Sequence, residues 1–165
     1  MSLRNTIISL VCALMLGGCT SLSQQQVDTA MIDNLASVEI VTVAGRDGQI
    51  YSRNLRQAMF SSYAAEPRYR LSSSISIGST EAFAVRGVSS DFKKMTMTVS
   101  FTLTDINTNE VAIKNTVTAS ATLGTVSSTY GIEQSKLQAK RRLATLLAER
   151  VRRRLQLYFL SIAQT

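Results

Sequence analysis

The sequence predicts an α+β fold, a two-layer sandwich in which two helices pack on one face of a four-stranded, largely antiparallel sheet (β-α-β-β-β-α). Several segments alternate apolar and polar residues with a period of two, which is typical of strands that have one buried face. Two other segments place apolar residues at three- and four-residue steps, which is typical of amphipathic helices. Packing both helices against the apolar side of one sheet buries all of these faces and leaves the other side of the sheet polar.

The first strand and the first helix follow from composition and spacing. Residues 37–43 are rich in β-branched side chains and predict the first strand. Asp47 and Gly48 favour a turn, and residues 49–63 then carry apolar side chains at helical spacing. Pro67 marks the end of this region.

Three further strands are predicted from alternation. Residues 68–77 form the second strand, and residues 78–92 are expected to be a polar connection. Residues 93–104 and 110–122 should form a hairpin around the turn-forming residues 105–109. The side chains expected to face the core are Tyr69, Leu71, Ile75, Ile77, Met95, Met97, Val99, Phe101, Leu103, Val111, Ile113, Val117 and Ala119.

The chain closes with a long predicted helix. Residues 123–134 are rich in glycine, serine and threonine and are expected to be a loop. The helix then runs from residue 135 to about residue 162. Its predicted buried stripe consists of Leu137, Ala144, Leu147, Val151, Leu155, Tyr158 and Ile162.

The N-terminus has the pattern of a bacterial lipoprotein leader. Arg4 precedes an apolar run at residues 6–16, which is too short to span a bilayer, since spanning needs roughly 20 residues. Leu16-Gly17-Gly18-Cys19 matches the lipobox, whose cysteine receives the lipid. We therefore expect a signal peptide at 1–18, a lipidated tether at 19–36 and one domain at 37–165. By similarity to enteric lipoproteins, Thr20 in place of aspartate favours the outer membrane, on its periplasmic side.

Composition excludes several function classes. The chain of 165 residues has no histidine, and its two cysteines are Cys12 in the leader and the lipobox Cys19. Ser-His-Asp and Cys-His catalysis and histidine metal sites are therefore impossible. We expect a protein that is not an enzyme and needs no cofactor. The net charge of +7 favours anionic partners such as lipid head groups or sugar phosphates, while export argues against nucleic acid.

A family resemblance rests on three segments of the mature chain. These are Pro67-Arg68-Tyr69-Arg70-Leu71, the hairpin from Val99 to Val111, and the closing Arg154-Leu155-Gln156-Leu157-Tyr158-Phe159. With the lipobox, they resemble the lipopolysaccharide-assembly lipoproteins of the LptE family over roughly residues 36–159. Residues 20–24 depart from the Gly-Phe-Arg-Pro-Leu-Tyr type segment of that family. The resemblance implies a non-catalytic subunit that plugs the outer-membrane β-barrel LptD, helps it assemble and assists lipopolysaccharide insertion into the outer leaflet.

The polar face of the sheet is the first candidate site. Alternation places Arg68, Arg70, Lys94 and Lys114 on it among serines and threonines. Guanidinium groups bind phosphate through paired hydrogen bonds, and hydroxyls match sugar oxygens, so these four residues are candidates for lipopolysaccharide binding. The alternative is a solvated face of a basic protein.

The last helix is the second candidate. Residues 136–154 carry eight positive charges against the single carboxylate of Glu149. Leu143 and a set of mixed residues are expected to lie away from the buried stripe. That set is a candidate partner surface and consists of Arg142, Leu146, Arg150, Arg153 and Leu157. The alternative is a solvated helix whose arginine stems cover stray leucines.

Three functions remain open at this point. The first is the plug subunit of the lipopolysaccharide translocon, and the second is an accessory lipoprotein of a phospholipid-transport complex. The third is an enzyme, which the missing histidine and thiol make the poorest. Co-purification separates the first two, since one predicts an outer-membrane barrel and the other an inner-membrane ATPase complex.

Overall fold

The predicted two-layer sandwich is confirmed by a computed structural model of the chain, which describes residues 31–59, 66–82, 92–123 and 128–163. The signal peptide, Cys19 and the tether up to residue 30 lie outside the described residues. The elements are, in order, β1 (Val38–Ile40), α3 (Arg46–Met59), β2 (Tyr69–Ala82), β3 (Phe92–Asp105), β4 (Val111–Leu123) and α4 (Thr129–Ala163).

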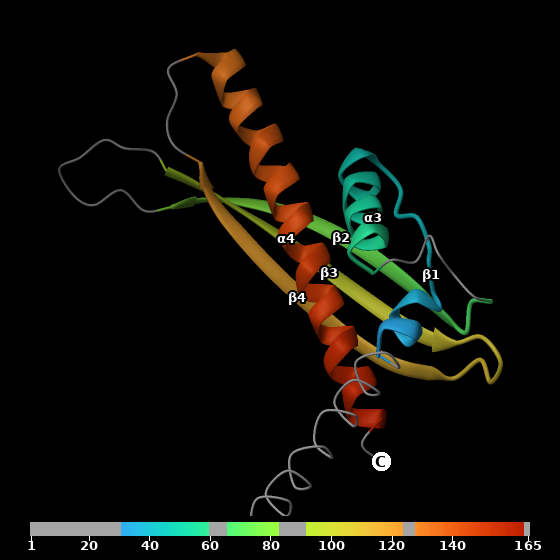
Figure 1. Cartoon of the computed structure of the whole chain (residues 1–165). Coiled ribbons are helices and arrows are strands. Elements are labelled where there is room, and N and C mark those ends of the chain that lie inside the picture. The colour runs from blue at the N-terminus through green and yellow to red at the C-terminus, as the bar shows by residue number, and fades with distance from the viewer. Residues whose placement is uncertain (1–30, 60–65, 83–91, 124–127, 164–165) are drawn as a thin grey trace, which may run out of the picture.

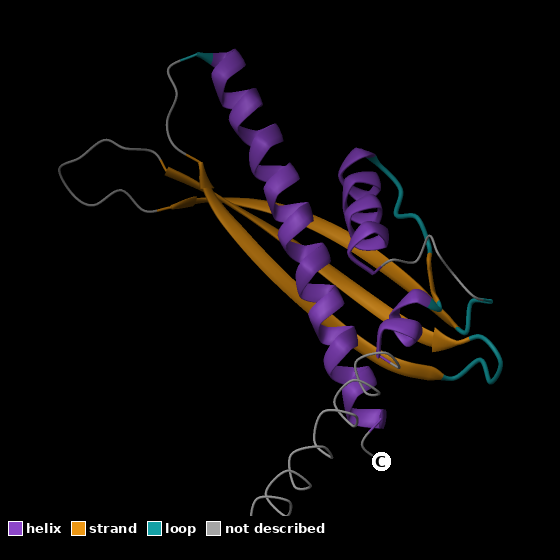
Figure 2. Cartoon of the chain, in the orientation of Figure 1, coloured by secondary structure: helices purple, strands orange, loops and turns teal. Residues whose placement is uncertain are grey.

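The four strands form one sheet in the order β1-β2-β3-β4. β1 runs parallel to β2, and the β2–β3 and β3–β4 pairs are antiparallel. Both helices lie on the same face of this sheet, with α4 running across it and α3 beside α4 (Figure 1). The opposite face of the sheet is left without a helical layer among the described residues (Figure 2).

The core lies between the sheet and the two helices. The alternation of β3 is confirmed, because its five predicted core residues, from Met95 to Leu103, are all buried. The helices contribute side chains that are fully buried against them. The largest of these are Tyr51, Leu55 and Met59 from α3 and Leu147, Leu155 and Phe159 from α4.

The helix α3 begins at Arg46, so the predicted turn at Asp47 and Gly48 is wrong. The turn is made by Gly45, two residues before Asp47, and its φ of 82° is the left-handed conformation that favours glycine. Gly48 serves a different purpose, because a Cβ there would lie 2.7 Å from the carbonyl oxygen of Val43. Gly48 therefore lets the first turn of the helix pack directly on the preceding backbone.

The lengths of β1 and β2 differ from the prediction. β2 continues through residues 78–82, which were predicted to be a connection, because this stretch pairs with β3 (Gly78 opposite Thr96). Backbone hydrogen bonds to β3 therefore extend β2 through residues whose side-chain pattern did not predict a strand. β1 is shorter than the predicted 37–43, since only residues 38–40 pair with β2.

The position of Val111 is a further correction. It was predicted to face the core, but its side chain is 60% exposed. A register shift at Leu103/Thr104 sets Ile113 opposite Leu103 and Val111 opposite Thr104. A bulge of this kind adds one residue to one strand and reverses which face the following side chains occupy. Val111 therefore lies on the polar face.

The helix α4 begins at Thr129, so residues 129–134 are helical and not part of a loop. Leu143 was predicted to lie away from the core but is 2% exposed, and Ile162 was predicted to be buried but is 44% exposed. The helix packs on β4 and β3 as well as on α3, so its buried face is wider than one stripe. Ile162 lies in the last turn before Ala163 and remains in solvent.

Residues 31–36, at the end of the predicted tether, are helical. Leu35 in this segment is only 5% exposed and belongs to the core cluster. The chain is therefore already packed against the domain before β1 begins.

The strand β4 forms one edge of the sheet. Two of its backbone groups are bonded to side chains. The Thr118 carbonyl oxygen accepts a hydrogen bond from Nη1 of Arg150 on α4. The Thr116 N–H donates to Oδ1 of Asn115 at 2.7 Å.

Candidate binding surfaces

The polar sheet face is a ladder of hydroxyl groups. The hydroxyls of Thr98 and Thr118 lie 3.1 Å apart across β3 and β4, and those of Ser100 and Thr116 lie 3.0 Å apart. Cross-strand hydroxyl pairs of this type stabilise a sheet modestly and leave lone pairs for other partners. The hydroxyl groups of this face can therefore hydrogen-bond to a polar ligand.

Two of the four cations predicted on this face already have carboxylate partners. Nε of Arg70 lies 2.9 Å from Oε2 of Glu39 on β1. Nε of Arg68 lies 3.7 Å from Oδ2 of Asp105, and its guanidinium carbon is 5.2 Å from the ring centre of Tyr69. Both members of the Arg70–Glu39 pair are exposed, so this pair contributes little to stability. In the longer Arg68–Asp105 pair the guanidinium is exposed and the carboxylate is mostly covered.

The four cations are divided between the two ends of the sheet. Lys114 lies opposite Thr102, and Arg70 lies opposite Thr104, so these residues are near the same end. Lys94 precedes Thr102 by eight residues on β3, which corresponds to about 27 Å. Among the described residues, neither lysine forms an ion pair. The structure thus brings Arg68, Arg70 and Lys114 toward one end and leaves Lys94 at the other.

The predicted surface on α4 is exposed along its whole length. Arg142, Arg150 and Arg153 are exposed, and the leucines between and beyond them, Leu146 and Leu157, are 42% and 60% exposed. Their spacing of three and four residues aligns them along one side of the helix. Because Arg150 reaches the backbone of β4, this stripe runs beside the edge of the sheet.

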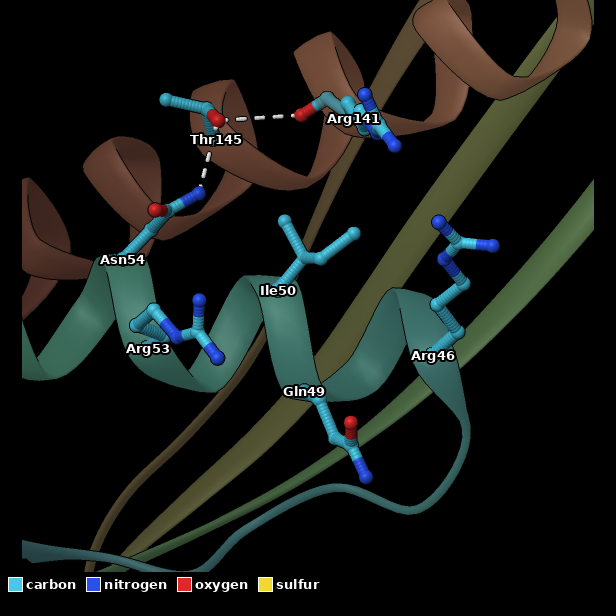
Figure 3. Close-up of a pocket in the computed structure, with 7 residues that line it drawn as sticks. All are labelled: Arg46, Gln49, Ile50, Arg53, Asn54, Arg141 and Thr145. Carbon is cyan, nitrogen blue, oxygen red and sulfur yellow. Dashed lines mark hydrogen bonds between the residues drawn. The ribbon is translucent and has the colours of Figure 1, made fainter.

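A cationic groove between α3 and α4 was not predicted from the sequence. Its lining consists of Arg46, Gln49, Ile50, Arg53 and Asn54 from α3 and Arg141 and Thr145 from α4 (Figure 3). A signal was present, since residues 46, 50 and 53 share one face of a helix at steps of four and three. The sequence alone did not indicate which face of α4 lies opposite them.

Two tyrosines in the core have perturbed ionisation. Burial raises the pKa of Tyr51 to about 12, and the hydroxyl contact with Ser73 at 3.3 Å acts in the opposite direction. Burial also raises the pKa of Tyr69, against the effect of the neighbouring Arg68 charge. Both phenols are therefore neutral at physiological pH, and the shifts disfavour acid–base chemistry near neutrality.

Across the described residues, no group of three or more acidic, histidine or cysteine side chains is placed to hold a metal ion. No helix in the same part of the chain combines the length and the apolar character needed to cross a membrane.

No known family model matches the sequence, and no curated protein has a significantly similar sequence. Solved structures do share the fold. A lipoprotein candidate from Caulobacter crescentus is 18% identical, with a TM-score of 0.65, over 79% of this chain and 96% of that one. A minor lipoprotein from Acinetobacter baumannii is 15% identical, with a TM-score of 0.56, over 72% of this chain and 89% of that one.

At these identities the similarity establishes the fold alone. The class it defines is an α+β domain that occurs in bacterial lipoproteins, and this agrees with the lipobox ending at Cys19.

Proposed function

We propose that this chain is an outer-membrane lipoprotein, held on the periplasmic side by lipid on Cys19, that plugs an LptD-like β-barrel. In this role it helps the barrel assemble and assists lipopolysaccharide insertion into the outer leaflet, without catalysis of its own. The support comes from the lipobox, from the resemblance to the LptE family and from a fold shared with lipoproteins.

The observation that carries the proposal is the outer side of α4. Leu146 and Leu157 are held in solvent by a helix that otherwise buries its leucines well. Arg142 and Arg150 flank Leu146, and Arg153 precedes Leu157 by one turn. Exposed apolar side chains mixed with arginine are typical of protein interfaces. Solvent alone gives these leucines no favourable contacts, whereas the wall of a barrel would bury them.

Lipopolysaccharide is the second partner in the proposal. Its phosphorylated sugars would contact the polar sheet face, where hydroxyls accompany Arg68, Arg70 and Lys114 at one end and Lys94 at the other. Because Arg68 and Arg70 already have carboxylate partners, Lys114 and Lys94 are the more available charges. A ligand that contacts all four must extend along the strands.

Co-purification from detergent-solubilised outer membranes of the native host tests the interface. The full chain carries a C-terminal tag, and the L146E/L157E double variant introduces charge into the proposed contact. We expect wild type to recover a large barrel protein and the variant to recover at least about tenfold less, because two buried carboxylates without partners cost several kcal/mol.

The matched control is Y130E/I132E, which places two carboxylates at exposed apolar positions of the same helix outside the stripe. This control should recover the barrel as wild type does. Recovery of an inner-membrane ATPase complex in place of a barrel would reject the proposal in favour of phospholipid transport. Equal losses in both double variants would remove the α4 stripe as the interface.

A further inference from the structure

The groove between α3 and α4 lies on the helical layer, away from the polar sheet face. Its volume is about 470 Å³, within the range of small-molecule sites. In Figure 3, Arg46 from α3 and Arg141 from α4 reach toward the same end, and Ile50 points into the space between the helices. Two elements distant in the sequence thus contribute to one concave surface.

Two bridges between the helices fix the width of the groove. Nδ2 of Asn54 donates to Oγ1 of Thr145 at 2.8 Å, and Nζ of Lys140 lies 3.4 Å from Oδ2 of Asp47. The seven residues from Asp47 to Asn54 correspond to about 10 Å along α3. The Thr145 hydroxyl also donates to the Arg141 carbonyl at 3.1 Å. The walls are therefore set before any ligand binds.

The charge of the groove is uncompensated. Its lining holds three arginines, Arg46, Arg53 and Arg141, and no carboxylate. In the part of the chain that the structure describes, none of the three forms an ion pair. Asp47, the acidic residue of the adjoining α3 turn, is already paired with Lys140. Three like charges along one groove repel one another, and a bound anion would remove that repulsion.

We propose that the α3–α4 groove binds a phosphate monoester or inorganic phosphate. A phosphate group with charge near −2 and three terminal oxygens matches several guanidinium forks better than a singly charged carboxylate does. The amide of Asn54 adds a neutral hydrogen-bonding group, and the half-buried Ile50 provides an apolar floor. This site is independent of the proposed function, because it uses neither the sheet face nor the outer stripe of α4.

Calorimetric titration of the full chain in a non-ionic detergent, at low ionic strength, tests the proposal. The probes are inorganic phosphate, dihexanoyl phosphatidic acid and, as a zwitterionic comparison, dihexanoyl phosphatidylcholine. We expect the first two to bind and the third not to bind. An affinity at least about tenfold higher for phosphatidic acid assigns a lipid head group as the source, and equal affinities assign free phosphate.

Charge reversals localise the binding. R46E and R141E, one on each helix, should each weaken phosphate binding about tenfold or more, because each removes a charge-assisted hydrogen bond. R154E makes the same charge change on an exposed part of α4 outside the groove and should keep the wild-type affinity. Thermal unfolding of each variant establishes that it is folded.

Several results would overturn the site. Among them are no binding of either phosphate probe, loss of affinity in R154E equal to that in R141E, and unchanged affinity in both groove variants. A polyglutamate peptide that displaces phosphate at equal charge concentration would assign the groove to an acidic protein and would also overturn it.

Discussion

The two faces of the sheet differ in what their side chains contact. On β3, alternate residues such as Val99 and Phe101 are buried under the helices, while the residues that follow each of them, Ser100 and Thr102, face the open side. The buried set removes apolar surface from water, which is the main source of folding free energy. The open set offers hydroxyls and a few cations, and these add little to stability.

This difference indicates which positions can be substituted without a large loss of stability. Side chains on the open face can be exchanged to suit a ligand at small energetic cost, because their contacts are with solvent and with each other. Side chains on the covered face are fixed by close packing, and most changes there leave a cavity or a clash. Four predictions test this comparison, from the largest expected effect to the smallest.

Adjacent residues of β3 give the most direct test. Phe101→Ala removes a side chain that is 1% exposed and should lower the free energy of unfolding by about 3 to 5 kcal/mol. Ser100→Ala removes one hydroxyl contact on the open face and should cost less than about 1 kcal/mol. Urea unfolding measures both, and similar losses would mean that the open face is covered by an unrecognised contact.

The burial of Tyr51 on the covered side of the sheet predicts that stability depends on pH. Because the pKa of Tyr51 is raised to about 12 in the folded protein from 10.0, the folded state holds this proton more tightly than the unfolded state. Its contribution is complete below pH 10 and is lost as pH rises toward 12, by roughly 2 to 3 kcal/mol.

Comparison with Tyr51→Phe isolates this effect from other alkaline titrations. Unfolding measured at several pH values should show that wild type loses stability relative to the variant above pH 10. A constant difference between the two proteins would contradict the raised pKa.

The first turn of α3 tests close packing at the edge of the covered layer. Gly48→Ala places a Cβ 2.7 Å from the Val43 carbonyl oxygen, so the helix must shift. We expect a loss of about 1 to 3 kcal/mol, even though alanine is normally the better helix former. Gln49→Ala, at an exposed position of the same turn, is the control and should be nearly neutral by thermal unfolding.

The smallest effect is expected on the open face. Arg70→Gln breaks the exposed pair with Glu39 and should cost about 0.2 to 1 kcal/mol, an amount that shrinks as salt is added. Lys114→Gln, which has no ion pair in the described structure, should change stability less. A large, salt-independent loss of stability in Arg70→Gln would contradict the expectation that this exposed ion pair contributes little.

Sequence reasoning succeeded where structure is determined locally. The alternation of β3 fixed its buried residues, and helical spacing fixed most of the α4 stripe, because each pattern depends on one element. The errors in which side chains were assigned to the wrong face of β4 or α4 involve contacts between two elements. Val111 changed faces because of a bulge between β3 and β4, and Leu143 is buried because α4 packs on the sheet as well as on α3.

The candidate sites follow the same rule. The outer stripe of α4 could be predicted from one helix, since exposure follows from spacing. The Arg70–Glu39 pair requires the parallel pairing of β1 and β2, which joins residues far apart in the sequence. The α3–α4 groove requires the relative placement of two helices, so its three arginines could be seen in the sequence but not as one site.

The edge of β4 has a consequence for self-association. A 13-residue edge strand would ordinarily offer a template on which a neighbouring molecule could add a strand of its own. Here the Thr118 carbonyl accepts a hydrogen bond from Arg150, and the Thr116 N–H donates one to the Asn115 side chain. Both groups lie near the middle of that strand. An incoming chain would have to displace both side chains, so a side chain from the helix that buries the core also hinders strand addition at this edge.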